Sequence, residues 1–330
     1  MASTRTAPPV SGARSMISTV AGVALIILAV GALVFRYVPI PGHLTMVAVI
    51  ASPFLMLAAP IAIIASWWGR HWGLAAVASG LTIVLIVVQL PSYLSAAPPP
   101  ASVAVRVMSM NMLYGRADAD AVTREAGHNA DVLMVQELTS AAARRLATSG
   151  LEATFPHQIL DPRPGAEGMG VYSRYPLTDA KKVPGFKLAL LTAEVAVPGV
   201  AGALAVASIH LAAPWPKPIE GWRADLAAFP RLLADLAAQA GDGSVIVAGD
   251  FNSTIDMRPF RQLLTNGYRD AAEQAGDGRN LTFPANRRFP AVIGIDHVLT
   301  RNATAVSTST TEIPRSDHRA LFATVMVPTN

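Results

Sequence analysis

Two short polar side chains, Asp250 and Asn252, follow a strand-like run in the second half of the chain. Residues 245–248 are apolar and mostly β-branched, which is typical of a strand buried on both faces, and Gly249 ends the run. Open α/β sheets carry their chemistry at the carboxyl ends of such strands. Asp and Asn are also common turn residues, so the motif indicates a site only if other parts of one occur elsewhere in the chain.

Such parts occur at five more places. Side chains that can hold a metal ion or move a proton follow or flank predicted strands at Asn111, Glu137, His210, Asp296 and the Asp317-His318 pair. Each alone has a structural alternative: Glu137 could cap the helix after it, His210 could be a hydrogen-bonded core histidine, and Asp317-His318 could be a solvated turn. His297 points to the opposite face from Asp296 in an extended segment, so we leave it outside the site.

Apolar periodicity after residue 100 predicts the elements that must position these side chains. Predicted strands cover residues 103–110, 131–136, 168–177, 190–197, 203–209, 244–248, 291–299 and 320–327, and predicted helices cover 118–128, 139–148, 222–240 and 259–264. Pro230 is expected to kink or divide the third helix. Strands that alternate with helices, followed by hairpins, predict an α/β fold of two sheets packed face to face with helices outside.

Six short motifs, in chain order, resemble the endonuclease/exonuclease/phosphatase (DNase I-like) superfamily of metal-dependent phosphoesterases. They are Met110-Asn111-Met112, Val135-Gln136-Glu137, Ser208-Ile209-His210-Leu211, Gly249-Asp250-Phe251-Asn252, Ile295-Asp296-His297 and Ser316-Asp317-His318. The motifs span nearly all of residues 103–327, and nothing in the resemblance covers the N-terminal third. The resemblance implies a four-layer α/β sandwich. Together with the apolar N-terminal third, it favours a membrane-anchored, bacterial-type member of the superfamily.

The resemblance also implies which residues hold a metal. Glu137 is expected to be the principal ligand, with Asn111 and Asp317 close to the ion or its waters. Oxygen ligands of this kind suit a hard cation that keeps several waters, so the expected cofactor is Mg²⁺, with Mn²⁺ as a substitute. The residues leave open whether one or two ions act.

The other motif residues are expected to carry the chemistry of phosphoester hydrolysis, which needs a base for water and donors for the phosphoryl charge. The resemblance makes His318 the general base, and Asp296 the residue that holds its imidazole in the required tautomer. Asp250 is expected to orient the attacking water and Asn252 to donate to a phosphoryl oxygen. His210 is expected to stabilise the charge on the phosphoryl group from the other side.

The N-terminal third has a different composition. The 330 residues are 52% hydrophobic with a mean hydropathy of +0.40, which is more apolar than an ordinary soluble protein. Uncharged apolar runs at 17–34, 44–68 and 72–90 are each long enough to cross a bilayer. They predict three transmembrane helices within residues 16–90, the second interrupted by Pro53 and Pro60, after a polar tail at 1–15.

Arginines in the N-terminal third predict the orientation in the membrane. Arg5 and Arg14 in the tail and Arg70 in the second loop outnumber Arg36 in the first, which favours a cytoplasmic N-terminus. After three spans, the chain beyond residue 90 is then outside the cytoplasm. We therefore expect a multi-pass cell-membrane protein with an extracytoplasmic phosphoesterase domain at 103–330, joined through a proline-rich linker at 91–102.

Charge restricts the partners. Only four of the 26 basic residues precede residue 101, and the other 22 balance the 22 acidic residues, so no general affinity for nucleic acid is expected. Cysteine is absent, which excludes disulfides and thiolate metal sites. The expected partners are a lipid bilayer, through residues 16–90, and a phosphoester substrate.

These observations predict a membrane-anchored, divalent-metal-dependent hydrolase of phosphoric ester bonds. It would be a phosphodiesterase or phosphatase acting outside the cytoplasm on a lipid head group or another envelope phosphoester, by metal-assisted in-line attack of water. A surface-tethered endo- or exonuclease is the alternative within the same chemistry. A catalytically inactive binding module on the same fold is a second alternative, which the complete set of acids, bases and amides disfavours.

Overall fold

The computed structural model describes residues 12–200, 202 and 204–329, and the chain divides into two compact units. The first unit runs to Leu90 and includes residues 256–258, and the second comprises residues 91–255 and the chain from Pro259 onward. Apart from residues 256–258, the two units therefore meet along the chain between Leu90 and Pro91.

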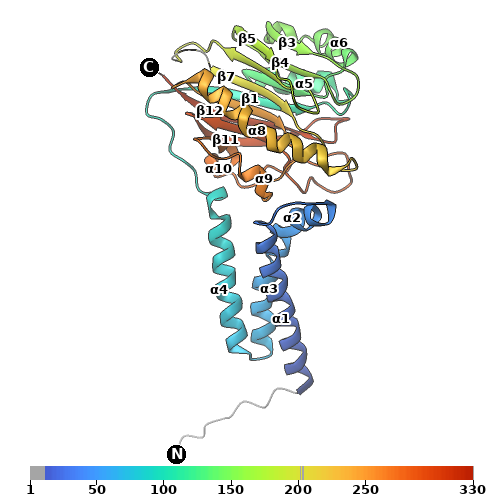
Figure 1. The fold of residues 1–330 in the computed structure, drawn as a ribbon, viewed down its shortest axis with the longest axis vertical. Helices are drawn as coiled ribbons and strands as arrows, with labels where there is room; N and C mark the ends of the chain where they lie inside the picture. The colour runs from blue at the N-terminus through green and yellow to red at the C-terminus, as the bar shows by residue number, and fades with distance from the viewer. Residues whose placement is uncertain (1–11, 201, 203, 330) are drawn as a thin grey trace, which may run out of the picture. The chain divides into compact units, whose positions relative to one another are not determined.

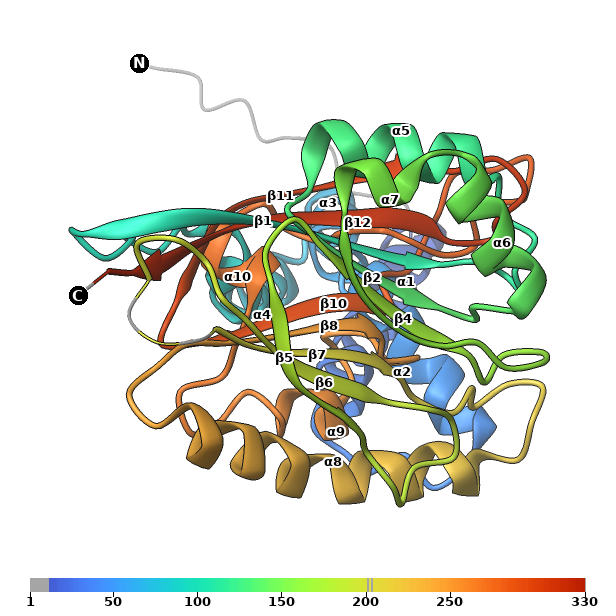
Figure 2. The same ribbon diagram turned by 90° about the horizontal axis from the view of Figure 1, so that it is seen from above.

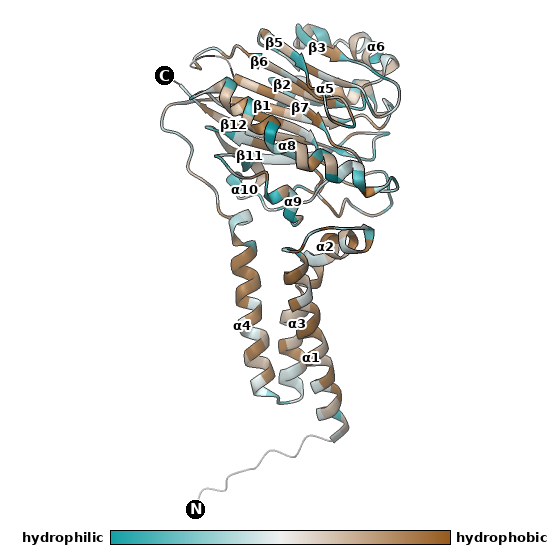
Figure 3. Ribbon diagram, in the orientation of Figure 1, coloured by the Kyte–Doolittle hydropathy of each residue, from teal (hydrophilic) through white to brown (hydrophobic). Residues whose placement is uncertain are grey.

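Among the described residues, the first unit contains four helices: α1 (Gly12–Phe35), α2 (His43–Leu55), α3 (Ala58–Trp68) and α4 (Trp72–Gln89) (Figure 1). Helices α1 and α4 are long and apolar enough to cross a membrane, and α2 with α3 makes a third candidate span if this pair, bent by 55°, is one broken span. Apolar residues cover most of the length of α1, α3 and α4 (Figure 3).

The first unit differs from the sequence prediction in two details. The second apolar run is divided between Leu55 and Ala58, and Pro60 lies in the first turn of α3, where a missing N–H costs little. The predicted tail at 1–15 is wrong at its end, because α1 begins at Gly12 and Arg14 is helical. The rest of that tail lies outside the described residues.

The second unit contains two six-stranded sheets packed face to face (Figure 2). Sheet A has the order β11-β12-β1-β2-β4-β3, and sheet B has the order β5-β6-β7-β8-β10-β9. The strands of sheet A are β1 (Ser102–Asn111), β2 (Val132–Gln136), β3 (His157–Asp161), β4 (Met169–Ser173), β11 (Thr304–Glu312) and β12 (Arg319–Pro328). Those of sheet B are β5 (Leu177–Lys182), β6 (Leu191–Val195), β7 (Leu204–His210), β8 (Val245–Asp250), β9 (Arg269–Asp270) and β10 (Asp296–Arg301).

The centres of the two sheets share one pattern of strand directions. In sheet A, β1 is parallel to β2 and antiparallel to β12. In sheet B, β8 is parallel to β7 and antiparallel to β10. In sheet A, the carboxyl ends of β1 and β2 therefore lie beside the amino end of β12. In sheet B, the carboxyl ends of β7 and β8 lie beside the amino end of β10, and the bond from Asn111 to Asp250 joins these two groups of strand ends. Six strand ends are in position to contribute side chains to one site.

Helices cover the outer faces of both sheets and complete four layers (Figure 2). Sheet A packs against α5 (Ala119–Asn129), α6 (Ser140–Thr148) and α7 (Leu151–Thr154), and sheet B packs against α8 (Ile219–Ala240). Two more short helices are α9 (Arg258–Arg261) and α10 (Ala271–Ala275). Along β1, Val105 and Val107 face the core between the sheets, whereas Met108 and Met110 face the helices. This alternation confirms the predicted four-layer α/β sandwich.

The sequence prediction missed the edge strands of both sheets as separate strands. Strands β3 and β11 form the edges of sheet A, and β5 and β9 form those of sheet B. Their residues are largely polar and partly exposed, so they lack the apolar run or alternation by which the central strands were predicted. Pro230 does not divide α8, which runs through it from Ile219 to Ala240, and Pro230 itself lies on the exposed face of the helix.

Residues 91–102, predicted to be a semi-rigid proline-rich linker, contact the rest of the second unit near their start. The 3₁₀ turn η1 (Leu90–Tyr93) follows α4 directly. The carbonyl of Ser92 then accepts from Gly278 N at 2.8 Å, and Ala96 N donates to the carbonyl of Gln274 at 2.6 Å. This segment is therefore packed on the second unit before β1 begins.

Candidate active site

Tight turns at the strand ends present the polar side chains. Leu113 and Tyr114 after β1, Glu137 after β2 and Asn252 after β8 all have left-handed backbone, with φ of 47°, 52°, 57° and 48°. Non-glycine residues adopt this region rarely, and it persists where surrounding contacts hold it, often at functional sites. The three turns therefore carry backbone strain at the edge where the motif residues meet.

Neighbouring backbone holds the turn at Glu137. Leu138 N donates to the carbonyl of Gly168 at 2.9 Å, and Arg163 N donates to the carbonyl of Leu138 at 3.1 Å. A Cβ on Gly168 would lie 1.9 Å from that same carbonyl oxygen, so only glycine fits there. The loop before β4 thus fixes the direction of the Glu137 side chain.

Asn111 joins two carboxylates from different sheets. Its Nδ2 donates to Glu137 Oε1 at 3.2 Å and to Asp250 Oδ2 at 3.0 Å. Its Oδ1 accepts from Leu113 N at 2.9 Å, and Tyr114 N donates to Glu137 Oε2 at 2.5 Å. Three residues predicted from separate motifs therefore form one buried cluster.

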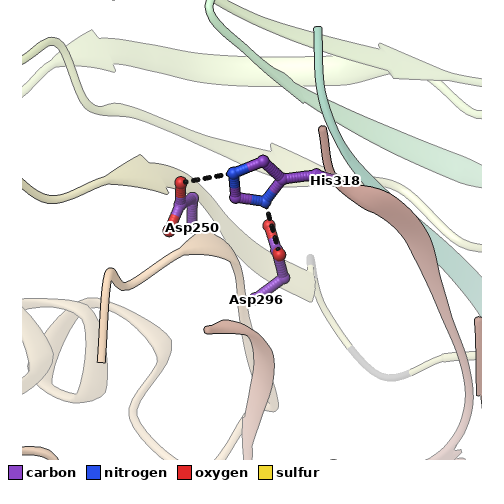
Figure 4. A group of neighbouring side chains, drawn as sticks. All are labelled: Asp250, Asp296 and His318. Carbon is purple, nitrogen blue, oxygen red and sulfur yellow. Dashed lines mark hydrogen bonds and ion pairs between the residues drawn. The ribbon is translucent and has the colours of Figure 1, made fainter. Parts of the chain in front are cut away.

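His318 lies between Asp250 and Asp296 (Figure 4). Its Nδ1 is 2.8 Å from Asp296 Oδ2, and its Nε2 is 3.6 Å from Asp250 Oδ2. A carboxylate at Nδ1 accepts a hydrogen bond from the Nδ1–H group and fixes the tautomer, which leaves Nε2 as the nitrogen that can exchange a proton with a reacting group. This is the arrangement expected for a base oriented by Asp296.

His210 faces the same cluster from the end of β7. Its Nδ1 is 3.2 Å from the carbonyl of Ala166, so the ring donates there and turns Nε2 toward Asp250 Oδ2 at 3.5 Å and Glu137 Oε1 at 3.9 Å. Asn252 is adjacent: its backbone N donates to Asp250 Oδ1, and its Nδ2 donates to the carbonyl of Leu211, each at 2.8 Å. One N–H of the Asn252 amide is then left for a ligand.

Asp317 is less closely integrated than the other predicted residues. Its side chain is half-buried, and in the described part of the chain its carboxylate makes no hydrogen bond with another site residue. The Asp317 charge still helps to raise the pKa of His318. Its predicted place near the ion or its waters therefore remains a prediction.

Burial shapes the acid–base properties of the site. Burial raises the pKa of Glu137, although the nearby His210 acts to lower it. Burial also raises the pKa of Asp250 to about 7, although the nearby His318 acts to lower it. Burial disfavours the charged form of His318, but Asp296 and Asp250 outweigh it and raise that pKa to about 10. Burial lowers the pKa of His210 despite the nearby Glu137 carboxylate. The site therefore holds protons at neutral pH that a bound cation would displace.

The donor set fits a hard divalent cation. No lysine or arginine of the described residues pairs with Glu137 or Asp250, so these buried carboxylates have only histidines as compensating charge. Asp250, Asp296 and His318 also offer ligand atoms that all lie within 4.8 Å of one another. Both ring nitrogens of His318 face carboxylates, however, as in a hydrogen-bonded base. The carboxylates of Glu137 and Asp250 are the better pair of oxygen ligands. The Asn111 amide turns its Nδ2 toward them, and its oxygen accepts from Leu113 N.

Sequence reasoning gave no role to several supporting residues, although Gln136, Ser208 and Ser316 stand within the quoted motifs. Ser316 Oγ donates to the carbonyl of Asn111 at 2.8 Å and accepts from His318 N at 3.1 Å. Beneath the site, Ser109 Oγ donates to Gln136 Oε1 at 3.2 Å, and Gln136 Nε2 donates to Ser208 Oγ at 3.4 Å across the two sheets. The one signal in the sequence that could have indicated these residues is their position within or near a motif, because serine and glutamine are common in all proteins.

The two tryptophans near His210 have different environments. Trp222 is fully buried, and its Nε1 donates to Ser253 Oγ at 3.0 Å, so it belongs to the core. Trp215 is 63% exposed in the loop after β7. Tyr114 and Phe289, at 51% and 53% exposed, lie in loops that lead from Asn111 and toward Asp296. Exposed aromatic side chains therefore accompany three of the loops that border the site.

Comparison with known proteins supports the fold and the family. A model of the endonuclease/exonuclease/phosphatase family matches residues 108–318. A solved endonuclease/exonuclease/phosphatase from Bacteroides vulgatus has a TM-score of 0.54 and 18% identity, covering 68% of this chain and 99% of its own. A humanised D. rerio TDP2 has a TM-score of 0.53 and 18% identity, covering 67% and 98%. At such identities the likeness concerns the fold. No match was found among curated proteins.

Proposed function

Because the chain belongs to the endonuclease/exonuclease/phosphatase family, whose members hydrolyse phosphoester bonds, we propose that it is a Mg²⁺-dependent, membrane-anchored phosphodiesterase or phosphatase. The observation that carries this proposal is the His318 ring held by Asp296 beside the buried carboxylates of Glu137 and Asp250. That arrangement combines an oriented base with a place for a hard cation, which hydrolysis of an anionic ester requires.

Glu137 would hold the ion, with Asn111 and Asp317 at the ion or its waters, and Mn²⁺ could replace Mg²⁺. The bound cation would supply positive charge to the phosphoryl oxygens and stabilise the ionised carboxylates around it. The same charge would lower the pKa of His318 toward the range in which a base works.

The chain's own residues would then move the proton and orient the groups. His318 Nε2 would accept a proton from water, and Asp296 would hold the imidazolium that forms. Asp250, whose Oδ2 lies 3.6 Å from that nitrogen, would orient the water. The free N–H of Asn252 and the ring of His210 would stabilise charge on the phosphoryl oxygens.

We propose a lipid head group or another envelope phosphoester, outside the cytoplasm, as the substrate. The same chain carries two or three helices long and apolar enough to cross a membrane, and Tyr114, Trp215 and Phe289 are exposed on loops that border the site. Aromatic side chains of this kind are common where proteins meet a lipid interface. The arginine distribution supports an extracytoplasmic second unit, which a reporter fused after Thr329 would test by its activity on either side.

A substrate panel tests the activity. Full-length protein in lipid nanodiscs is offered a phospholipid, a chromogenic phosphodiester and single-stranded DNA, with Mg²⁺ or with EDTA. The proposal expects hydrolysis of the lipid or the diester that EDTA stops, and loss of hydrolysis in Glu137→Gln. Cleavage of DNA alone would favour the surface-tethered nuclease, and no hydrolysis of any substrate would favour the inactive binding module.

A further inference from the structure

Thr282 connects the start of β10, where Asp296 lies, with the start of β12, which directly follows His318. The residue is fully buried, and its Oγ1 accepts from Ile295 N at 3.2 Å and from Asp296 N at 3.4 Å. Its carbonyl accepts from Arg319 N at 2.8 Å, directly after His318. The ring of Phe283, the next residue, lies 5.1 Å from the His318 ring.

This connection matters because no strand ladder joins the two partners. Asp296 begins β10 in sheet B, whereas His318 precedes β12 in sheet A. The 2.8 Å separation between Asp296 Oδ2 and His318 Nδ1 therefore depends on contacts that cross between the sheets. Thr282 makes such contacts with both sides, and a shift of its loop would change this separation.

The loop that leads to Thr282, residues 276–281, lies against the segment that leaves the last helix of the first unit. We call residues 92–96 the strap. Gly278 N donates to the carbonyl of Ser92 at 2.8 Å, and just before the loop the carbonyl of Gln274 accepts from Ala96 N at 2.6 Å. The Tyr93 side chain is also hydrogen-bonded to Arg279.

Two glycines in this loop are required by the strap. Gly276 and Gly278 have φ of +72° and +76°, so a side chain at either would be strained. A Cβ on Gly276 would also lie 2.7 Å from Ser95 N, and a Cβ on Gly278 would lie 2.7 Å from Tyr93 Cε1. The loop and the strap are therefore fitted to each other along their whole contact.

We propose that Thr282 is a positioning residue for the Asp296–His318 pair and that the strap holds the loop that presents it. The chain that follows α4 is then a structural part of the active site and not a passive tether. The proposal rests on the proposed phosphoester hydrolysis for its kinetic test, and a second test by hydrogen exchange is independent of any activity.

The kinetic test replaces Thr282 in the full-length protein. Thr282→Val keeps the volume and removes the acceptor for the two amides, so we expect kcat to fall by about 10- to 100-fold while KM changes by less than about twofold. Thr282→Ser restores the hydroxyl and should recover kcat to within about threefold of the natural protein. A serine variant as slow as the valine variant, or a valine variant with unchanged kcat, would overturn the positioning role.

The exchange test uses two matched glycines. Gly278→Ala and Gly267→Ala add the same methyl group at positive φ, +76° and +86°, but only the first meets the strap, since the nearest atom to a Cβ at Gly267 is 3.6 Å away in Arg301. Gly278→Ala should speed amide exchange in the peptide that covers residues 282–296, and Gly267→Ala should leave it unchanged. Equal exchange in the two variants would refute the strap, whether or not the protein hydrolyses a phosphoester.

Discussion

The second unit contains two buried histidine–aspartate pairs with nearly the same geometry. His318 Nδ1 lies 2.8 Å from Asp296 Oδ2, and His297 Nδ1 lies 2.7 Å from Asp270 Oδ2. Both rings are buried, and in both the partner carboxylate helps to raise the histidine pKa above its usual value against the effect of burial. The pairs differ in what the second ring nitrogen faces.

His318 Nε2 faces the Asp250 carboxylate at the strand edge, whereas His297 Nε2 lies 2.9 Å from the carbonyl of Ser253. The carbonyl of Ser253 cannot exchange a proton, so Nε2 of His297 is engaged inside the core and does not face a place for a reacting group. The Phe260 ring lies 4.1 Å from it. A histidine–aspartate pair alone therefore does not identify a base; the surroundings of the other nitrogen decide.

The largest expected difference comes from removing each histidine. His318→Ala should lower kcat by about 10²- to 10⁴-fold, the usual contribution of a positioned base, with the fold retained. His297→Ala should instead lower the free energy of unfolding by about 3–5 kcal/mol, because it leaves the Asp270 carboxylate buried and unpaired. Its kcat per folded molecule should remain that of the natural protein.

Steady-state kinetics and thermal unfolding of both variants check this contrast. Activity lost on His297→Ala in protein that circular dichroism shows to be folded would place the second pair in the site as well.

Removing the charge of each partner aspartate should again lower kcat for one pair and stability for the other, by smaller amounts. Asp296→Asn should lower kcat by about 10- to 100-fold, because the amide no longer fixes the tautomer of His318. Asp270→Asn keeps an oxygen for the amides of Ala272 and Glu273, which Asp270 caps at α10, and loses the charge-assisted bond to His297. Its free energy of unfolding should fall by about 1.5–3 kcal/mol with kcat unchanged. Equal kinetic effects of the two variants would show that the pairs share one role.

The smallest expected effect is a pH dependence of stability. Burial opposes the charged form of His297, but Asp270 outweighs it and raises the pKa in the folded protein above the 6.5 of an unperturbed histidine. The folded state then binds the proton more tightly than the unfolded state. The stabilisation by His297 should be complete below about pH 6.5 and should be lost as the pH rises through the folded-state pKa.

Denaturation of the natural protein and of His297→Gln across this pH range measures that dependence. The difference in unfolding free energy between them should shrink as the pH rises. A difference that grows with pH would show that His297 is held neutral.

Much of the fold followed from local patterns. The central strands β1, β2, β7, β8 and β12 were predicted because each is an apolar run that ends in a polar residue or a turn. The helices α5 and α6 were predicted too, and each begins after a capping side chain: Asp118 accepts from Ala121 N, and Thr139 accepts from Ala142 N. The edge strands were missed because an edge strand of polar residues has the composition of a loop, and its pairing depends on the neighbouring strand.

By itself, the sequence determined which segments are apolar, where the buried strands end and which polar residues stand at those ends, since these properties depend on neighbours a few positions apart. Only the tertiary structure decided that Asn111 meets Asp250, which is 139 positions away, and that His297 pairs with Asp270 in the core. It also decided that the apparent linker is packed against the loop of Thr282. Contacts of this kind depend on how two separately formed sheets pack together, and neither periodicity nor propensity records that packing.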